Sequence, residues 1–434
     1  MSRFGTLVLL VTLSGAVAPA QELTLLGHTS ISGGFITDVV RYVDQFTGDQ
    51  YALVGSSNLV SIVDVNDPAN PVVVRTISMP GFDVRVWGNY IYGVTGGGGG
   101  NQGKIYDLST PTSPVFMGSF DSAHNIFIGD NGFMFAEAPG LKIYDLNINP
   151  PFPTEVWDGG NFGGHDAAAI GDRLYDFHGG STNIYQVTYT ESFDITLLGS
   201  ITDPTIAYHH SGWTTKDGRY LLICDELANG SDADITVWDI LDPSNAERVD
   251  EFSDPNATVH NLYIIGDYAY VSFYTAGIRV FDVSDPTNIV LVDEYDTSPA
   301  SGEGFDGAFG IDPFSETGNI YVSDQTGLYI FSFGAPTGVD DQPSDLPASF
   351  TLDQNYPNPF NPSTTIGFSI PHDSHVRLVV TDLTGQTVAT LIDGPRTAGA
   401  HHVRWSPEGL SSGLYLYTLE TSTFRESRKL MYLR

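Results

Sequence analysis

Four segments of the chain place a histidine beside another polar residue at recurring intervals. They are His124-Asn125, His165-Asp166, His209-His210 and His260-Asn261. Neutral imidazoles and carboxylates together are common ligands of Zn²⁺, Mn²⁺, iron and Ni²⁺. One hypothesis is therefore a divalent metal site, whose candidate ligands are His124, His165, His209 and His260.

Further polar residues fall at the ends of neighbouring predicted strands, close to the same rim. They are Glu137, His178, Asp225, Glu226, Tyr274 and Asp324. With a bound metal, Asp166 and Glu226 are candidate acid or base groups of a metal-dependent hydrolase or lyase. The candidates for lining a ligand site or channel are thus His124, His165, His178, His209, His210, His260, Asp166, Glu137 and Glu226.

A structural role explains the same histidines equally directly. Each copy of a repeated fold has the same backbone groups in need of hydrogen-bond partners. An equivalent histidine can therefore bond the backbone of a neighbouring strand in each copy. The pattern therefore favours a binding or scaffold module over an enzyme, and it assigns no catalytic residue. The residue types leave open whether a metal binds.

Two other clusters are weaker candidates. The acidic stretch from Asp225 to Asp234 offers oxygen ligands for Ca²⁺, but it lacks the spacing of a helix-flanked calcium loop. The single cysteine, Cys224, follows an apolar strand, which is typical of a buried and unreactive thiol. One cysteine also excludes an internal disulfide framework.

A strand motif recurs through the region that contains these residues. Its copies are Ser61–Val65, Lys104–Leu108, Lys142–Leu146, Asn183–Val187, Thr236–Ile240, Arg279–Val283 and Tyr329–Phe333. Equivalent positions are separated by 43, 38, 41, 53, 43 and 50 residues. Each copy is accompanied by further short strands and tight turns, and four strands in forty-odd residues are typical of a propeller blade. Seven copies predict a seven-bladed β-propeller.

The N-terminal segment predicts how the propeller closes. The seventh copy lacks a fourth strand, and Glu22–Gly27 (ELTLLG) resembles the outer-strand segment Asp194–Gly199 (DITLLG). We expect the first segment to pair into the last blade, which removes an open sheet edge. The aspartate of the repeated motif precedes a turn, where its carboxylate is expected to accept backbone N–H bonds. Those aspartates are Asp64, Asp107, Asp145, Asp239 and Asp282.

The two ends of the chain have the composition of targeting segments. Residues 1–20 combine Arg3, an apolar run and an Ala-Pro-Ala site, as a secretory signal peptide does. Residues 334–349 are rich in Pro, Gly and Asp and predict a linker. Residues 350–434 alternate short apolar strands with turns, which predicts a small Ig-like β-sandwich. The complete prediction is an all-β chain with the propeller over residues 21–333.

The C-terminal segment resembles a known family. Its motif is Asn355, Tyr356, Pro357, Asn358, Pro359, Phe360, Asn361 and Pro362, and the segments DLTGQTV and SSGLYLY follow it. These residues resemble the type A sorting domain of the type IX secretion system, found in the Bacteroidota and neighbouring lineages. The resemblance implies that the type IX secretion machinery is a partner. It also implies that the protein is secreted or attached to the outer surface.

The repeated strands resemble the LVIVD-repeat family. More broadly, residues 21–434 resemble the extracellular proteins called choice-of-anchor B, in which a propeller carries differing C-terminal sorting signals. That resemblance implies a fold and an address but no chemical activity. A surface protein, a glycan or a small ligand is the expected partner.

The charge of the chain excludes some partners. The chain has 52 acidic and 18 basic residues, a net charge of -34. Residues 350–434 are neutral, with seven of each sign, so residues 21–349 carry 45 acidic and 10 basic residues. Such a surface cannot neutralise phosphates, which excludes nucleic acid. No stretch of the predicted mature chain approaches the 18 apolar residues that a membrane-spanning helix needs.

Overall fold

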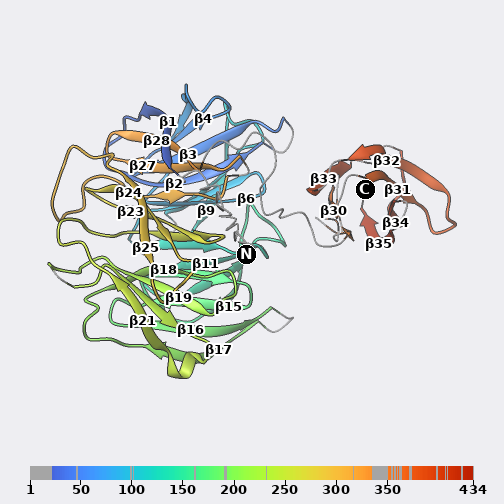
Figure 1. The fold of residues 1–434 in the computed structure, drawn as a ribbon. Helices are drawn as coiled ribbons and strands as arrows, with labels where there is room; N and C mark the ends of the chain where they lie inside the picture. The colour runs from blue at the N-terminus through green and yellow to red at the C-terminus, as the bar shows by residue number, and fades with distance from the viewer. Residues whose placement is uncertain are drawn as a thin grey trace, which may run out of the picture.

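The computed structural model describes residues 22–334 and 350–433, apart from short gaps within both ranges. The predicted signal peptide and nearly all of the predicted linker lie outside the described residues. The described part is almost entirely β-structure, and its one helix is a short 3₁₀ turn, η1 (Pro243–Asn245). Figure 1 shows the strands of the body and of the C-terminal segment.

The body is built from four-stranded antiparallel sheets whose strands follow one another along the chain. The first sheet contains β2 (Ile36–Val43), β3 (Gln50–Ser56), β4 (Val60–Asp64) and β5 (Val72–Ile77). The second contains β6 (Asp83–Trp87), β7 (Tyr90–Val94), β8 (Gly103–Asp107) and β9 (Val115–Phe120). The third contains β10 (Asn125–Ile128), β11 (Phe133–Glu137), β12 (Lys142–Asp145) and β13 (Thr154–Asp158). The fourth contains β14 (Asp166–Ile170), β15 (Arg173–Phe177), β16 (Thr182–Thr188) and β17 (Asp194–Ile201).

Three further sheets continue the pattern. The fifth contains β18 (His209–Thr214), β19 (Tyr220–Asp225), β20 (Ile235–Asp239) and β21 (Glu247–Phe252). The sixth contains β22 (Leu262–Ile265), β23 (Tyr268–Phe273), β24 (Gly277–Asp282) and β25 (Val290–Tyr295). The seventh contains β26 (Ile311–Asp312), β27 (Asn319–Asp324), β28 (Gly327–Phe333) and the N-terminal β1 (Leu23–Ser30). The body is therefore propeller-like in its repeating sheets.

The N-terminal strand takes the outer position of the seventh sheet. β1 pairs antiparallel with β28, from Leu23 opposite Phe333 to Ser30 opposite Gly327. This is the pairing that the ELTLLG segment predicts. β1 and β28 are the first and last strands of the body in the sequence, so their pairing joins the two ends of this part of the chain.

A β-bulge occurs at the same place in all seven sheets, where the third strand meets the outer strand. The extra outer-strand residues are Leu26, Val74, Met117, Val156, Leu198, Val249 and Val292. Each of them is apolar. All except Val292 pack against an apolar core cluster. The bulge takes one residue of the outer strand out of the normal alternation, so that its side chain can pack against an apolar core cluster. β1 carries it too, which makes β1 equivalent to the other outer strands.

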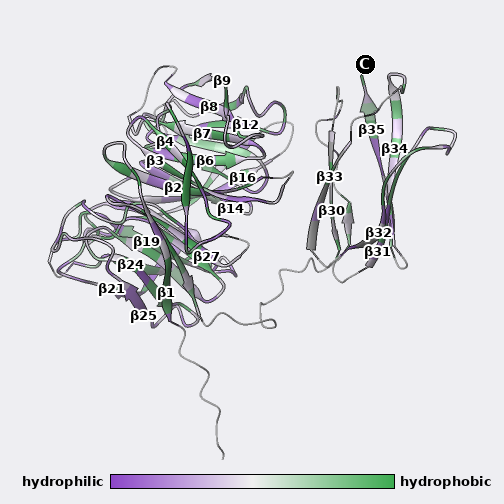
Figure 2. Ribbon diagram, turned by 90° about the horizontal axis from the view of Figure 1, so that it is seen from above, coloured by the Kyte–Doolittle hydropathy of each residue, from purple (hydrophilic) through white to green (hydrophobic). Residues whose placement is uncertain are grey.

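The innermost strands connect neighbouring sheets. β2 contacts β6, β6 contacts β10, β10 contacts β14, β14 contacts β18 and β18 contacts β22. β23 then contacts β26, and both β26 and β27 contact β2. Most residues of β2 are buried, whereas β21 and β25 on the outside carry hydrophilic residues, as Figure 2 shows. Burial between sheets therefore holds the inner strands together, because apolar surface is removed from water there.

Buried hydroxyls add hydrogen bonds between neighbouring sheets. Thr37 Oγ1 donates to the carbonyl of Gly81 at 2.6 Å, and Ser211 Oγ donates to that of His260 at 2.7 Å. The hydroxyl of Ser323 in the seventh sheet donates to the carbonyl of Thr37 in the first. The first and seventh sheets are thus joined by a direct bond as well as by apolar packing.

The aspartates of the repeated motif act as predicted. In each case Oδ1 accepts the backbone N–H of the residue two positions later, at 2.8–3.0 Å. The five aspartates are Asp64, Asp107, Asp145, Asp239 and Asp282. Each bond closes the turn after its strand, so part of the acidic surface has a structural cause.

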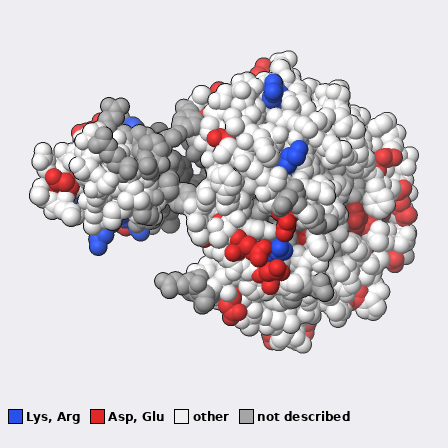
Figure 3. All heavy atoms as spheres, turned by 180° about the vertical axis from the view of Figure 1, so that it is seen from behind, with Lys and Arg blue, Asp and Glu red and all other residues white. Residues whose placement is uncertain are grey.

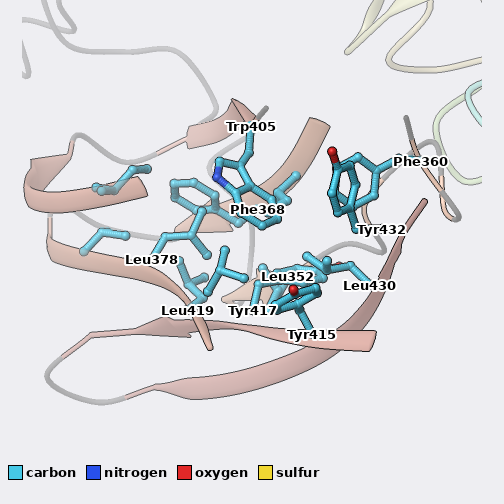
Figure 4. Close-up of a cluster of buried hydrophobic side chains, with 14 of the residues drawn as sticks. Leu352, Phe360, Phe368, Leu378, Trp405, Tyr415, Tyr417, Leu419, Leu430 and Tyr432 are labelled. Atoms are coloured by element: carbon cyan, nitrogen blue, oxygen red, sulfur yellow. The ribbon is translucent and has the colours of Figure 1, made fainter. Parts of the chain in front are cut away.

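The C-terminal segment forms two sheets around one core. One sheet contains β29 (Thr351–Leu352), β30 (Thr364–Ile370) and β33 (Gly399–Trp405). The other contains β32 (Thr387–Arg396), β31 (Ser374–Thr381), β34 (Gly413–Glu420) and β35 (Arg425–Tyr432). Figure 4 shows their apolar side chains meeting between the strands, with Phe368, Leu378 and Tyr417 among them. Strand alternation places these residues on the inner faces of both sheets.

Candidate functional site

Six ring-bearing side chains from six sheets form a closed circuit, here called the inner ring. Its members are Phe82, His124, His165, His210, His260 and Phe309. Neighbouring ring centroids lie 4.1–5.8 Å apart, and the contact between Phe82 and Phe309 completes the circuit. Each residue lies at or just before the start of an innermost strand. The sheets therefore bring together four histidines that are far apart in the sequence.

His210, and not His209, belongs to the inner ring. In the pairing of β18 with β19, His209 lies opposite Asp225 and Ser211 lies opposite Cys224, so His210 is the extra residue of a bulge. The ring of His209 is fully buried elsewhere, with Nδ1 2.8 Å from the hydroxyl of Thr182. The prediction that His209 joins the metal ligands is thus corrected, because the bulge reverses which neighbour faces inward.

Backbone carbonyls fix the tautomers of three ring histidines. Nδ1 of His210 lies 3.1 Å from the carbonyl oxygen of His260, and Nδ1 of His260 lies 2.7 Å from that of Phe309. Nδ1 of His124 bonds the carbonyl of Gly96. A carbonyl only accepts, so each Nδ1 carries the proton and each neutral ring keeps its lone pair on Nε2. The structural role considered from the sequence is therefore present, and it leaves Nε2 unused.

Burial keeps these imidazoles neutral. It lowers the pKa of His210 to about 3 and that of His260 to about 4. The pKa of His165 falls to about 2, first through burial and then through its neighbours His210 and His124. The pKa of His124 is lowered as well. At neutral pH the inner ring therefore presents lone pairs and not positive charge.

Glu226 and Tyr274 complete one side of the inner ring. Glu226 follows β19, and its Oε2 lies 3.5 Å from Nε2 of His210. Its Oε1 lies 4.0 Å from Nε2 of His260 and accepts the hydroxyl of Tyr274 at 2.5 Å. Burial and then Glu226 raise the pKa of Tyr274, which therefore stays protonated as a donor. The hydroxyl of Tyr274 thus holds the carboxylate beside the two imidazoles.

An acidic group with one arginine lies next to the inner ring. Arg85 donates to Oδ1 of Asp83 at 2.6 Å and also bonds Asp38. Burial acts to raise the pKa of Asp38, but Arg85 and backbone N–H groups hold it below its usual value. Burial raises the pKa of Asp83 well above its usual value, and that of Asp166 to about 7. Asp38 and Asp83 also accept N–H groups of the next sheet, from Val84 and Ile126.

The inner ring and this acidic group line one cavity of about 250 Å³, here called the inner cavity. Phe305, Tyr274 and Glu226 line it together with the four histidines and with Asp38, Asp83, Arg85 and Asp166. The cavity thus combines aromatic walls, neutral imidazoles and carboxylates. Such a set binds a cation or a ligand rich in hydrogen-bond donors.

Three other predicted residues have separate partners. Glu137 is fully buried and accepts the backbone N–H of Gly164 at 3.1 Å, and burial raises its pKa well above the usual value. His178 lies 2.7 Å from Asp176. Asp324 accepts the hydroxyl of Thr297. None of these three lines the inner cavity. Sequence reasoning missed Asp38, Arg85 and Phe309, although Asp38 and Asp83 occupy the same part of equivalent strands.

The acidic stretch considered for Ca²⁺ has its carboxylates engaged. Asp225 accepts the backbone N–H groups of Ala207, Tyr208 and Leu227 at 2.5–3.1 Å. Asp234 accepts that of Asp254 at 2.5 Å. Glu226 points instead towards the ring histidines. Asp225 and Asp234 therefore organise loops, because their carboxylates already accept backbone N–H groups.

Asp234 gives a prediction for pH dependence. It is 2 % exposed, and burial raises its pKa to about 7. Between its unfolded pKa near 4 and pH 7 the folded state holds the extra proton, so its stabilising contribution falls as pH rises, by at most about 1.4 kcal/mol per pH unit. Asp234→Asn should therefore be more stable relative to the wild type at pH 8 than at pH 5. Urea unfolding at both values measures this, with the exposed Asp232→Asn as control. Equal differences at the two values would contradict it.

The described residues of the sorting motif bind the last strand. Asn358 accepts the N–H of Met431 through Oδ1 at 2.7 Å, and Phe360 exchanges backbone bonds with Met431 and Leu433. The ring of Phe360 is 2 % exposed, and its centroid lies 5.1 Å from that of Tyr432 and 5.8 Å from that of Trp405. Figure 4 shows the rings of Phe360 and Tyr432 side by side. Asn355 donates to Thr364 from Nδ2 at 2.8 Å. Tyr356, Pro357, Pro359, Asn361 and Pro362 lie outside the described residues. The motif thus bonds the start of the C-terminal segment to its last strand, β35.

Phe360→Ala should destabilise the C-terminal segment by about 3 kcal/mol, because a large buried ring leaves a cavity. Export of the protein should decrease together with this stability, since we expect the sorting signal to work only when the C-terminal segment is folded. Immunoblots of cell and medium fractions would measure export, and a melting curve would measure stability. Leu383→Ala is the matched control, since Leu383 is 66 % exposed. Normal stability of Phe360→Ala would refute the packing argument.

The repeating sheets and the C-terminal segment define a propeller-like protein that carries a separate sorting domain. Family models specify both parts. The LVIVD repeat matches residues 48–78, 82–122 and 258–297, and the secretion system C-terminal sorting domain matches residues 354–432. The chain therefore contains LVIVD repeats and a type IX sorting domain. The sorting domain implies export and attachment at the outer surface. No helix among the described residues is long and apolar enough to cross a membrane.

Individual relatives are distant. An uncharacterized protein of Archaeoglobus fulgidus is 28% identical over 149 residues, which cover 28% of this chain and 24% of that protein. Raptor from Chaetomium thermophilum is 13% identical, with a TM-score of 0.51 over 71% of this chain and 29% of that chain. A putative 6-phosphogluconolactonase from Bacteroides uniformis is 14% identical, with a TM-score of 0.47 over 64% of this chain and 95% of that chain. The chain thus spans about a quarter of the first protein and under a third of Raptor, and the likeness to Raptor concerns the fold alone.

Proposed function

We propose that this chain is an exported binding module, a closed seven-bladed propeller over residues 21–333 that binds a small ligand in its inner cavity. A linker at 334–349 joins it to the sorting domain at 350–434, and residues 1–20 direct it across the inner membrane. The resemblance to choice-of-anchor B proteins supports this order of parts. The pairing of β1 with β28 and the contact of β2 with β26 and β27 support the closed ring.

The inner cavity is the observation that carries this function. Its volume of about 250 Å³ is just below the range of sites for drug-sized ligands, so it suits a small molecule or an ion better than a protein or glycan chain. Its walls present acceptor atoms at Glu226 and Asp166 and at Nε2 of His124, His210 and His260. The surface charge disfavours nucleic acid as a ligand, because acidic residues cluster on the face in Figure 3 and basic residues are few there.

Thermal shift tests this proposal. The exported protein, stripped of metal with EDTA, is screened against small amines, polyols and organic acids. A ligand at about 100 times its Kd should stabilise the protein by about 2.7 kcal/mol and raise its melting temperature. The shift should disappear in His165→Trp, which fills the cavity, and persist in His178→Trp, outside it. A shift that survives in His165→Trp places binding elsewhere and refutes the proposal.

A metal-dependent hydrolase or lyase is the second candidate. It is favoured by Asp166, which lines the same cavity as Glu226 and has a pKa raised by burial to about 7, suited to proton transfer at neutral pH. Turnover of ester, phosphate or lactone substrates should then show an inflection near pH 7 that Asp166→Asn removes. Turnover without that inflection would reject Asp166 as the acid or base.

A further inference from the structure

We propose that the inner cavity holds one divalent transition-metal ion, bound by Nε2 of His210, Nε2 of His260 and a carboxylate oxygen of Glu226. The proposal deepens the proposed function, since it names a ligand for the same cavity. It differs from the site predicted from the sequence, because His209 lies outside the cavity and the close group of ligand atoms contains neither His124 nor His165. The three donors come from the fifth and sixth sheets and from the loop after β19.

The donor atoms are already close to a coordinating arrangement. One ligand atom from each residue lies within 4.8 Å of the other two. Ligands at about 2.0–2.1 Å in a tetrahedral zinc site lie about 3.4 Å apart. Nε2 of His210 lies 3.5 Å from Oε2 of Glu226, which fits that value, and Nε2 of His260 lies 4.0 Å from Oε1, which exceeds it by about 0.6 Å. Binding one ion through one of these oxygens therefore requires the carboxylate to turn and the two imidazoles to move slightly closer together.

The surroundings of the three residues resemble those of metal ligands. A metal-binding imidazole usually donates its second N–H to a backbone carbonyl, which fixes the ring and the tautomer. His210 and His260 both do so through Nδ1. They are 3 % and 4 % exposed, so their lone pairs face the cavity and not bulk water. Tyr274 likewise fixes Glu226, because its hydroxyl donates to Oε1.

The donor set selects the kind of metal. Two imidazoles and one carboxylate suit Zn²⁺, Co²⁺ or Ni²⁺, whereas Ca²⁺ and Mg²⁺ prefer oxygen ligands alone. Three protein ligands leave a coordination position open, and the cavity supplies room for water or a ligand oxygen there. Since the ring histidines stay neutral, the carboxylate of Glu226 balances part of the charge of the ion.

Zinc titration of the full exported chain tests the proposal. After EDTA treatment, the wild type should bind one equivalent of Zn²⁺ by calorimetry, and Co²⁺ should give a visible absorption spectrum that Zn²⁺ abolishes. Glu226→Gln keeps the shape and the bond from Tyr274 but removes a ligand charge. It should weaken Zn²⁺ binding at least about 100-fold, the upper end of the effect of losing an outer partner of a metal ligand. His260→Gln should do the same.

His178→Gln is the matched control, because His178 lies outside the inner cavity. It should bind Zn²⁺ as the wild type does. Melting curves of the metal-free variants check that each one folds. Absence of stoichiometric Zn²⁺ binding by the wild type overturns the metal site, as does an equal loss in His178→Gln and Glu226→Gln. Because the small-molecule screen uses metal-free protein, a ligand found there supports the binding module even if the metal site fails.

Discussion

A chain that lacks residues 22–27 is expected to unfold at a temperature at least about 10 °C below that of the intact protein. β1 contributes backbone bonds to β28 and buries Leu23, which is 7 % exposed. At about 1 kcal/mol net for each hydrogen bond and about 2 kcal/mol for the leucine, the loss is about 5 kcal/mol or more. In a domain of this size each kcal/mol corresponds to about 2–4 °C. Differential scanning calorimetry of both proteins measures the change.

The position of Gly27 shows that β1 contacts the first sheet as well as pairing with the seventh. A Cβ atom on Gly27 would lie 2.1 Å from the carbonyl oxygen of Pro68, in the turn between β4 and β5 of the first sheet. Gly199 in β17 has the same relation to Pro243, at 1.8 Å. The resemblance of ELTLLG to DITLLG thus reflects two outer strands that each pack against the turn of the next sheet. β1 therefore joins the seventh sheet to the first.

A point substitution tests the same interface without deleting a strand. Gly27→Ala should destabilise the protein clearly, because its Cβ meets a backbone oxygen that cannot move cheaply. Gly180→Ala is the control, since no atom lies within 4 Å of the Cβ position there. A deletion variant that melts within about 2 °C of the intact chain would show that β1 does not hold the ends of the body together.

Arg85→Met is expected to destabilise the body by about 5 kcal/mol, the upper end of the cost of breaking a buried ion pair. The side chain of Arg85 is 16 % exposed, and those of Asp38 and Asp83 are 7 % and 6 % exposed. Removing the guanidinium leaves the buried carboxylate of Asp38, with the carboxyl group of Asp83 beside it, without a cation. The pKa of Asp38, now held down by Arg85, should rise in the variant. Urea unfolding at pH 7 measures the loss of stability.

Two comparisons isolate the charge effect. Arg75→Met changes an exposed arginine and should shift stability by no more than about 0.5 kcal/mol. Adding Asp38→Asn and Asp83→Asn to Arg85→Met should recover part of the loss, because the unpaired charges are removed with their partner. If the triple variant is as unstable as Arg85→Met alone, packing of the long side chain, and not its charge, is what the body requires.

The sequence predicted the local structure of this chain well. The repeated motif identified the third strand of each sheet, and its aspartates close the turns after the strand in the expected way. The turns and strands of the C-terminal segment were equally readable, because each depends on neighbours within a few residues. The bulge common to all seven outer strands was missed, although an apolar residue occupies the bulged position in every one.

The chemical groups of this protein can be read directly from its residues: repeated histidines at strand starts, an acidic body and a neutral sorting segment. Which of these groups meet depends on how the sheets pack. Successive side chains of a strand alternate, so the adjacent His209 and His210 point to opposite sides, and the register of the bulge at His210 decides which of them faces inward. Glu226 meets His260, and Arg85 meets Asp38, because separate sheets pack side by side. Local pattern sets a strand and its turn, whereas the register of a bulge and the contacts between sheets depend on packing over the whole body.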